Sequence, residues 1–190
     1  MKLIASLVLL GSVLISLSQS KLTGQKASTR ATRDDLINYL REISGQYTIS
    51  GQHNREPNSD PSKWTRTAHD ITGKYPGLWG GDFLFLNDDF QHRQDMINEA
   101  IKEWNAGSIV ALTWHVCPPN IGETCNWDNQ GILSGLSDSQ WNDLVTSGGG
   151  LNNKWKARLD TIIPYLRQLE NAGVVALWRP IHEMNEGQSF

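Results

Sequence analysis

Four short apolar runs alternate with helical stretches along this chain, and this alternation restricts the fold more than any other feature. The runs are expected as strands at 47–50, 76–83, 108–115 and 174–178. Between them, apolar residues recur at the three- and four-residue spacing of amphipathic helices. Strands that alternate with helices form a parallel sheet with right-handed crossovers. The sequence therefore predicts an α/β protein built from successive β/α units.

The helical stretches have recognisable starts and stops. The first helix is expected directly after Thr32, whose side chain can cap it, and it ends at Gly45. Pro164 lacks an amide hydrogen, so we expect it to kink the last helix. The remaining helices are expected at 64–72, 87–105, 137–145 and 154–171.

Each apolar run ends in side chains that can bind or react. Because the carboxyl ends of parallel strands meet at one rim, these side chains are expected to line a single pocket. For Asp82, which follows two glycines, an ordinary turn is the alternative. The strand-end residues are His53, Asp82, Trp114 with His115, and His182 with Glu183.

The last of these strand ends resembles a known motif. The segment Arg179-Pro-Ile-His-Glu-Met-Asn185 is similar to the acid/base motif of glycoside hydrolase family 26, the β-mannanase family. Three segments match the family pattern in the same order: Ser50-Gly-Gln-His53, Gly80-Gly-Asp82 and Trp114-His115. The resemblance runs from about Asp34 to the end of the chain. It implies a (β/α)8 TIM barrel, of which residues 32–190 would be the N-terminal part, ending after strand four.

The resemblance also implies a reaction. Retaining glycosidases use two carboxyl groups about 5–5.5 Å apart, one as nucleophile and one as acid/base. Glu183 matches the proton donor, and the family nucleophile, at the end of strand seven, would lie outside this chain. We therefore expect the 190-residue chain to be inactive on its own. A structural carboxylate paired with Arg179 is the alternative role for Glu183.

Substrate contacts are expected from the other strand ends. His53 and His115 would hydrogen-bond sugar hydroxyls, with support of a neighbouring group as the alternative. His182 would reach the substrate unless it belongs to the barrel wall. Flat aromatic faces suit sugar rings, which makes the indoles candidate platforms. The expected substrate-binding residues are His53, Asp82, Trp114, His115, Trp127 and His182, whereas Trp64, Trp104 and Trp155 lie on helix stripes and are expected in the core.

The N-terminus has the pattern of a secretory signal peptide. Lys2 precedes an apolar run at 3–17, and small residues up to Ser20 allow cleavage before Lys21. The apolar run is shorter than the roughly 20 residues of a membrane-spanning helix. Residues 1–20 are therefore expected to be removed on secretion, with an uncleaved anchor as the alternative, and 21–31 form a polar lead-in.

Both cysteines, Cys117 and Cys125, lie in the long loop at 116–153. In an oxidising compartment such a pair is expected to form a disulfide, which would stiffen the loop. A metal site with His115 is the alternative, but further ligands are lacking, so no metal is predicted. Long loops in compact domains usually serve function.

Composition limits the class of partner. The 17 Lys and Arg residues are balanced by 20 Asp and Glu residues, giving a net charge of −3, and no basic cluster indicates nucleic-acid binding. Eight tryptophans favour sugar binding. The predicted protein is a secreted, retaining endo-β-1,4-mannanase that hydrolyses mannan or galactomannan, with no cofactor, membrane contact or obligate protein partner. The alternatives are a β-glucanase or β-xylanase of the same family and a non-catalytic, carbohydrate-binding half barrel.

Overall fold

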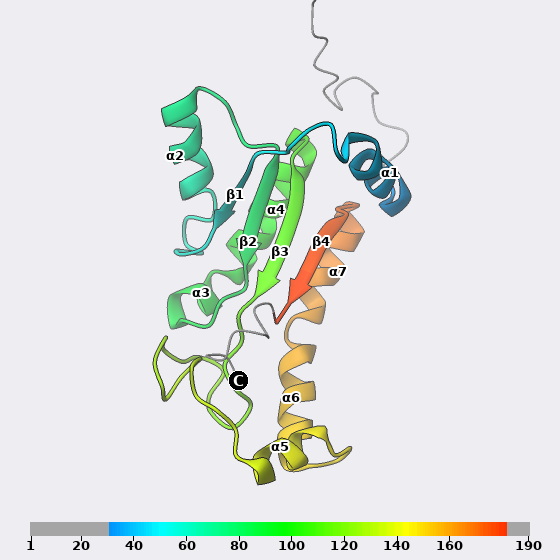
Figure 1. Cartoon of the computed structure of the whole chain (residues 1–190). Helices are drawn as coiled ribbons and strands as arrows, with labels where there is room; N and C mark the ends of the chain where they lie inside the picture. The colour runs from blue at the N-terminus through cyan, green and yellow to red at the C-terminus, as the bar shows by residue number, and fades with distance from the viewer. Residues whose placement is uncertain (1–30, 182–190) are drawn as a thin grey trace, which may run out of the picture.

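Four parallel strands form one sheet in the order of the chain (Figure 1). The computed structural model describes residues 31–181, so the expected signal peptide, His182 and Glu183 lie outside the described residues. The strands are β1 (Gly51–Asn54), β2 (Leu78–Asp82), β3 (Ile109–Trp114) and β4 (Ala176–Pro180). This arrangement confirms the predicted parallel α/β architecture.

Seven helices are described between residues 31 and 181. The first begins as predicted, because Thr32 accepts a hydrogen bond from the Asp35 amide (3.2 Å) and the Asp35 carboxylate accepts one from the Thr32 amide (2.8 Å). None of them is long and apolar enough to cross a membrane. The helices are α1 (Arg33–Ile43), α2 (Lys63–Thr72), α3 (Asn87–Gln91), α4 (Arg93–Ala106), α5 (Asp138–Val145), α6 (Gly150–Asp160) and α7 (Ile163–Ala172).

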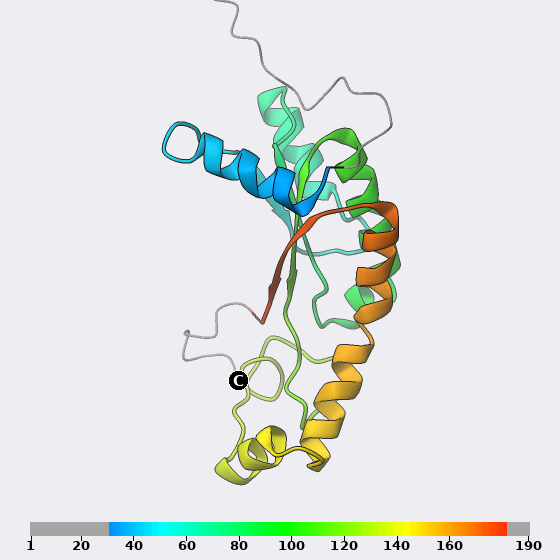
Figure 2. The same ribbon diagram turned by 90° about the vertical axis from the view of Figure 1, so that its right-hand side faces the viewer.

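The helices cover one face of the sheet. Seen edge-on, α4 and α7 pack along that face, while α5 and α6 extend beyond the carboxyl ends of the strands (Figure 2). Within residues 31–181 no helix covers the other face below α1, which crosses the opposite end of the sheet (Figure 2). The main core lies between the sheet and α4 and α7, and it consists of Trp79, Phe83, Met96, Ile97, Ala100, Val110, Leu112, Trp114, Val116, Ile162, Leu169 and Val174.

Strand periodicity decides which residues can reach a pocket. Successive side chains point to opposite faces of a sheet. On β3, Val110, Leu112 and Trp114 join the helix-covered core. His115 follows Trp114 and is therefore directed to the opposite face. The side chain of Asp82 likewise points to the face opposite that of Trp79 and Phe83. Asp82 and His115 therefore share the face that the helices leave uncovered.

The first strand lies four residues later than predicted. The sequence predicts it at 47–50, but β1 covers Gly51–Asn54 and begins where Gly51 pairs with Leu78. Tyr47, in the predicted strand, is 71% exposed. A strand needs a hydrogen-bonded neighbour, and β2 offers one only from Leu78 onward. His53 therefore belongs to the strand itself and does not follow it.

Two predicted long helices are each divided. The helix expected at 87–105 is interrupted at His92 (φ −104°, ψ 16°), which separates α3 from α4. The helix expected at 154–171 is also two helices, and Pro164 lies in the first turn of α7. Amides of a first turn have no helical acceptor, so proline starts a helix there more readily than it kinks one.

Candidate active site

Three of the predicted residues meet at the carboxyl rim of the sheet, around Asp82. The Asp82 Oδ2 atom accepts a 2.6 Å hydrogen bond from His115 Nδ1, and His53 Nε2 lies 3.6 Å from the same oxygen. The other oxygen, Oδ1, accepts from the backbone amides of Leu84 (3.0 Å) and His115 (3.2 Å). The convergence predicted from the strand ends is therefore present for β1, β2 and β3.

The environment keeps Asp82 ionised. Burial alone would raise the pKa of this carboxyl, but the hydrogen bond from His115 and the neighbouring His53 outweigh burial and hold the pKa well below its ordinary value. An ionised carboxylate can only accept, so His115 Nδ1 must carry the hydrogen. In the neutral ring Nε2 is then the acceptor nitrogen. Asp82 thus fixes both the orientation and the tautomer of His115.

Gly80 makes room for this arrangement. It is the register partner of His53, and a Cβ atom at Gly80 would lie 2.9 Å from His53 Nδ1 and 3.2 Å from His53 Cα. Any larger residue would displace the imidazole. The glycine therefore permits the close approach of backbone and side chain beside Asp82.

A cleft of about 340 Å³ opens beside His115. Trp127 forms one side of it: this side chain is 53% exposed, and its ring centroid lies 6.2 Å from that of His115 and 6.0 Å from that of Phe85. A half-exposed indole beside a cleft that also contains an imidazole and two charged side chains suits a sugar face. The lining residues are Arg55, Glu56, Leu84, Phe85, Leu86, His115 and Trp127.

Sequence reasoning missed the residues that the two shorter loops bring to the cleft. Arg55 and Glu56 come from the loop after β1, and Phe85 comes from the loop after β2. The sequence contained one signal: a second apolar run, Phe83 to Leu86, directly follows Asp82 at a strand end. Such a run in a rim loop has to be covered by other chain segments or by a ligand.

Two predicted substrate contacts are wrong. Trp114 is only 1% exposed and stacks on Trp155 in the helix-covered core, with ring centroids 6.0 Å apart. Adjacent strand residues cannot both face the cleft, and His115 occupies that face. Asp82 is completely buried, so its side chain has no surface to offer a sugar. Its role is to hold the histidines.

The expectation for the core tryptophans is correct for Trp104 and Trp155, which pack against the main cluster. It is wrong for Trp64, which is 40% exposed. Its indole Nε1 donates to the carbonyls of Arg55 (3.2 Å) and Glu56 (3.0 Å). Trp64 therefore supports the loop that lines the cleft.

A buried amide and a buried acid anchor the same loop. The Asn58 side chain is fully buried and donates to the Asp82 carbonyl (2.9 Å), while its backbone amide donates to Asp89 Oδ1 (3.4 Å). Burial, together with the charges of Glu56 and Asp88, raises the pKa of Asp89 to about 6. Among the described residues, Asp89 Oδ2 has no hydrogen-bond partner.

This anchor predicts an unusual pH dependence. Because the folded-state pKa of Asp89 lies above its unfolded value, the stability that its protonated form provides is lost as pH rises from about 4 through 6. We expect Asp89→Asn in the full-length protein to raise the melting temperature at pH 7 by about 2 °C or more and to leave it unchanged at pH 4. Calorimetry at both pH values checks this, with Asp160→Asn, an exposed residue at the end of α6, as control. An Asp89→Asn variant that is less stable than wild type at pH 7 would contradict it.

The predicted disulfide is present between Cys117 and Cys125. It closes the start of the long loop after β3, and the chain reaches Trp127 two residues later. Between residues 31 and 181, no group of three or more His, Cys, Asp or Glu side chains is placed to hold a metal ion. The cysteines therefore act as a covalent brace on the loop that carries the indole.

The fourth strand ends at the same rim. Pro180 is the register partner of Trp114, and the Ile181 amide donates to the Trp114 carbonyl (3.2 Å). Ile181 has a φ of 51°, so the regular alternation of β4 ends there. His182 and Glu183 follow directly and lie outside the described residues.

Comparison with known proteins extends this picture. The sequence model of the family described as Glycosyl hydrolase family 26 matches residues 25–190. The mannan endo-1,4-beta-mannosidase A and B of Caldalkalibacillus mannanilyticus is 30% identical over 154 residues, which cover 77% of this chain and 28% of that protein.

Two solved structures share the fold. GH26A from Muricauda sp. superposes with a TM-score of 0.75 at 31% identity, covering 86% of this chain and 51% of its own. A beta-mannanase from a symbiotic protist of the termite Reticulitermes speratus, complexed with a gluco-manno-oligosaccharide, has a TM-score of 0.65 at 25% identity, covering 84% and 50%. This chain therefore spans about half the length of these solved structures and less than a third of the Caldalkalibacillus protein.

Proposed function

This chain belongs to glycosyl hydrolase family 26, and from this premise we propose that the full-length protein is a retaining endo-β-1,4-mannanase. The observation that carries the proposal is the Asp82–His115 pair beside a cleft with an exposed indole. The four parallel strands of the described residues supply half of the strands of a (β/α)8 barrel, the fold of its structural relatives. Relatives that share this half are mannan endo-1,4-beta-mannosidases.

The proposed chemistry needs two carboxyl groups on opposite sides of the scissile bond. We assign the acid/base role to Glu183, which protonates the leaving oxygen and later deprotonates the attacking water. The nucleophile would come from the end of strand seven, where the family places it. His182, adjacent to Glu183, would position the sugar or the nucleophile.

The described residues would hold the sugar. His115, with Nε2 as acceptor, would receive a hydrogen bond from a sugar hydroxyl. His53, on β1, lies near the same Asp82 oxygen that holds His115. Trp127 would stack on a sugar ring across the cleft. Because Asp82 fixes the His115 ring before substrate arrives, the ring would lose little conformational freedom on binding.

Incubation of the full-length protein with linear β-mannan, xylan and mixed-linkage β-glucan tests this function. We expect manno-oligosaccharides as the main product, with the β-anomer formed first in proton NMR spectra. Products from xylan or β-glucan alone would indicate another specificity of the same site. Binding of mannan without any product would indicate a carbohydrate-binding protein.

We also propose that the protein is secreted. The apolar segment at 3–17 supports this, and a disulfide between Cys117 and Cys125 agrees with an oxidising compartment. N-terminal sequencing of protein recovered from the medium should then start near Lys21.

A further inference from the structure

An arginine of α6 holds the loop that carries the indole platform. Arg158 is only 7% exposed, and all four hydrogen bonds of its two terminal nitrogens go to main-chain carbonyls of one loop. Nη1 donates to Cys117 and to Pro118 (3.0 Å), and Nη2 donates to Ile121 and Gly122 (3.0 Å each). The rigid fork of a guanidinium can fix several acceptors at once, which a single ammonium cannot do.

The loop is held at two further points. The Cys117–Cys125 disulfide closes it, and the Cys125 amide donates to the Phe85 carbonyl (3.1 Å). A small core separate from the main one fills the space beneath it, and this core consists of Leu84, Phe85, Cys117 and Ile132. The chain then leaves Cys125 and places Trp127 against Phe85 and His115.

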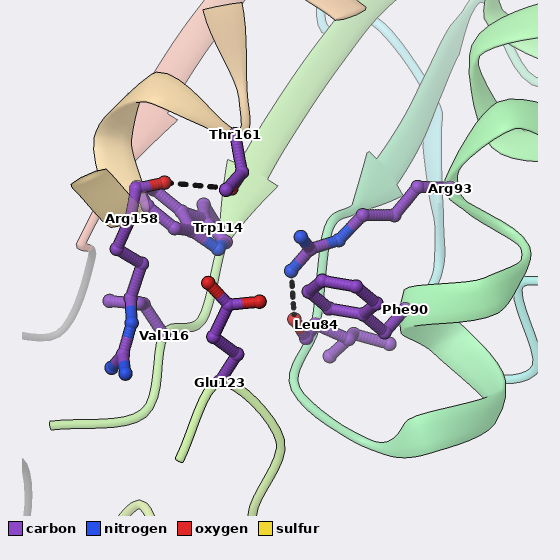
Figure 3. Close-up of a pocket in the computed structure, with 8 residues that line it drawn as sticks. All are labelled: Leu84, Phe90, Arg93, Trp114, Val116, Glu123, Arg158 and Thr161. Atoms are coloured by element: carbon purple, nitrogen blue, oxygen red, sulfur yellow. Dashed lines mark hydrogen bonds between the residues drawn. The ribbon is translucent and has the colours of Figure 1, made fainter. Parts of the chain in front are cut away.

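The charges around Arg158 fit a residue that holds the loop better than one that binds a ligand. Figure 3 shows Glu123, from the same loop, directed toward the space between Arg158, Trp114 and Arg93. Burial lowers the pKa of Arg158, and the negative charge of Glu123 partly offsets this. The loop thus supplies both the carbonyl acceptors and a nearby counter-charge for one buried cation.

We infer that Arg158 is a positioning residue for the substrate: through the carbonyls of 117–122 it fixes the disulfide loop so that Trp127 stands at the cleft. The identity of the ligand, a β-mannan chain stacked on Trp127, rests on the proposed function. Arg158 itself donates only to the backbone of the loop, so its inferred effect on the ligand is indirect and passes through the loop to Trp127.

A double-mutant cycle in the full-length protein tests this route. The variants are Arg158→Met, Trp127→Ala and their combination, and Arg167→Met on the exposed side of α7 is the matched control. We expect Arg158→Met and Trp127→Ala each to raise KM for mannan about tenfold, with kcat within about twofold of wild type. The combination should raise KM no further, because both changes remove the same contact. Arg158→Lys, which keeps the charge without the fork, replaces Arg158→Met if the latter does not fold.

Additive effects, with KM raised about a hundredfold in the combination, would overturn the inference, as would an unchanged KM in either single variant. A second readout is independent of activity. A protease specific for glutamate should cut after Glu123 at least about tenfold faster in Arg158→Met than in wild type, while Arg167→Met is cut at the wild-type rate. Equal cutting would show that Arg158 does not hold the loop. If the wild-type enzyme cleaves no mannan, the proposed function fails. The proteolysis experiment still tests whether Arg158 holds the loop.

Discussion

Replacing Glu183 by Gln in the full-length protein should lower kcat on β-mannan by about 10²- to 10⁴-fold, the usual contribution of general acid catalysis. The leaving group of mannan is a sugar hydroxyl, which departs as a poor alkoxide unless a proton reaches it. A glutamine occupies the same volume and can still hydrogen-bond the substrate, but it has no proton to transfer. KM should therefore change much less than kcat. Initial rates on linear mannan measure the effect.

The choice of substrate separates this role from a structural one. An aryl mannoside with a dinitrophenolate leaving group needs no proton to depart, so its bond cleavage should survive in Glu183→Gln while mannan hydrolysis is lost. Glu186→Gln, three residues along the same segment, is the matched control and should retain wild-type rates. Mannan hydrolysis by Glu183→Gln within a few-fold of wild type would remove Glu183 from the mechanism.

The rim of the barrel could be predicted from the sequence because it depends only on strand direction. Parallel strands bring their carboxyl ends to one edge, so His53, Asp82 and His115 had to lie close together once the β/α alternation was recognised. The disulfide was predictable for a similar reason. The chain has only two cysteines, and their separation of 8 positions in sequence leaves few ways for them to lie apart.

It was harder to predict which rim residues face the cleft and which ones support them. Strand alternation allows only one member of the Trp114–His115 pair to face the cleft. Which member does so depends on which face of the strand packs into the core. That core contains Val110 and Leu112, so Trp114 joins them and His115 does not. The position of Asp82 at a strand end predicts a substrate contact, but its complete burial makes it a support for His115 instead.

The supporting contacts could not be read from sequence at all. Arg158 reaches a carbonyl 41 residues away, and Asn58 reaches one 24 residues away. No local spacing, periodicity or motif encodes such pairs, because they depend on how separate β/α units pack. The residues that position the site are therefore less visible in sequence than the residues that form it.

Asp82→Asn should be the most damaging change among the described residues. The substitution removes the negative charge that strengthens the hydrogen bond from His115 and that attracts His53. This loss should cost about 1.5–3 kcal/mol in the free energy of unfolding. The substitution also allows the other His115 tautomer, because an amide NH2 turned toward Nδ1 would make Nδ1 the acceptor and leave the hydrogen on Nε2. Since the ring would then offer a donor where the substrate needs an acceptor, kcat/KM on mannan should fall at least about tenfold.

The pH dependence of this loss identifies its cause. The folded-state pKa of Asp82 lies well below its unfolded value, so the stability that its carboxylate provides is present above about pH 4 and is lost as pH falls below that. The difference in unfolding free energy between wild type and Asp82→Asn should therefore be large at pH 6 and shrink toward pH 3 in urea titrations. Asp70→Asn, on exposed α2, should show no such trend. A difference that stays constant from pH 6 to pH 3 would mean that Asp82 supports the site by its shape and not by its charge.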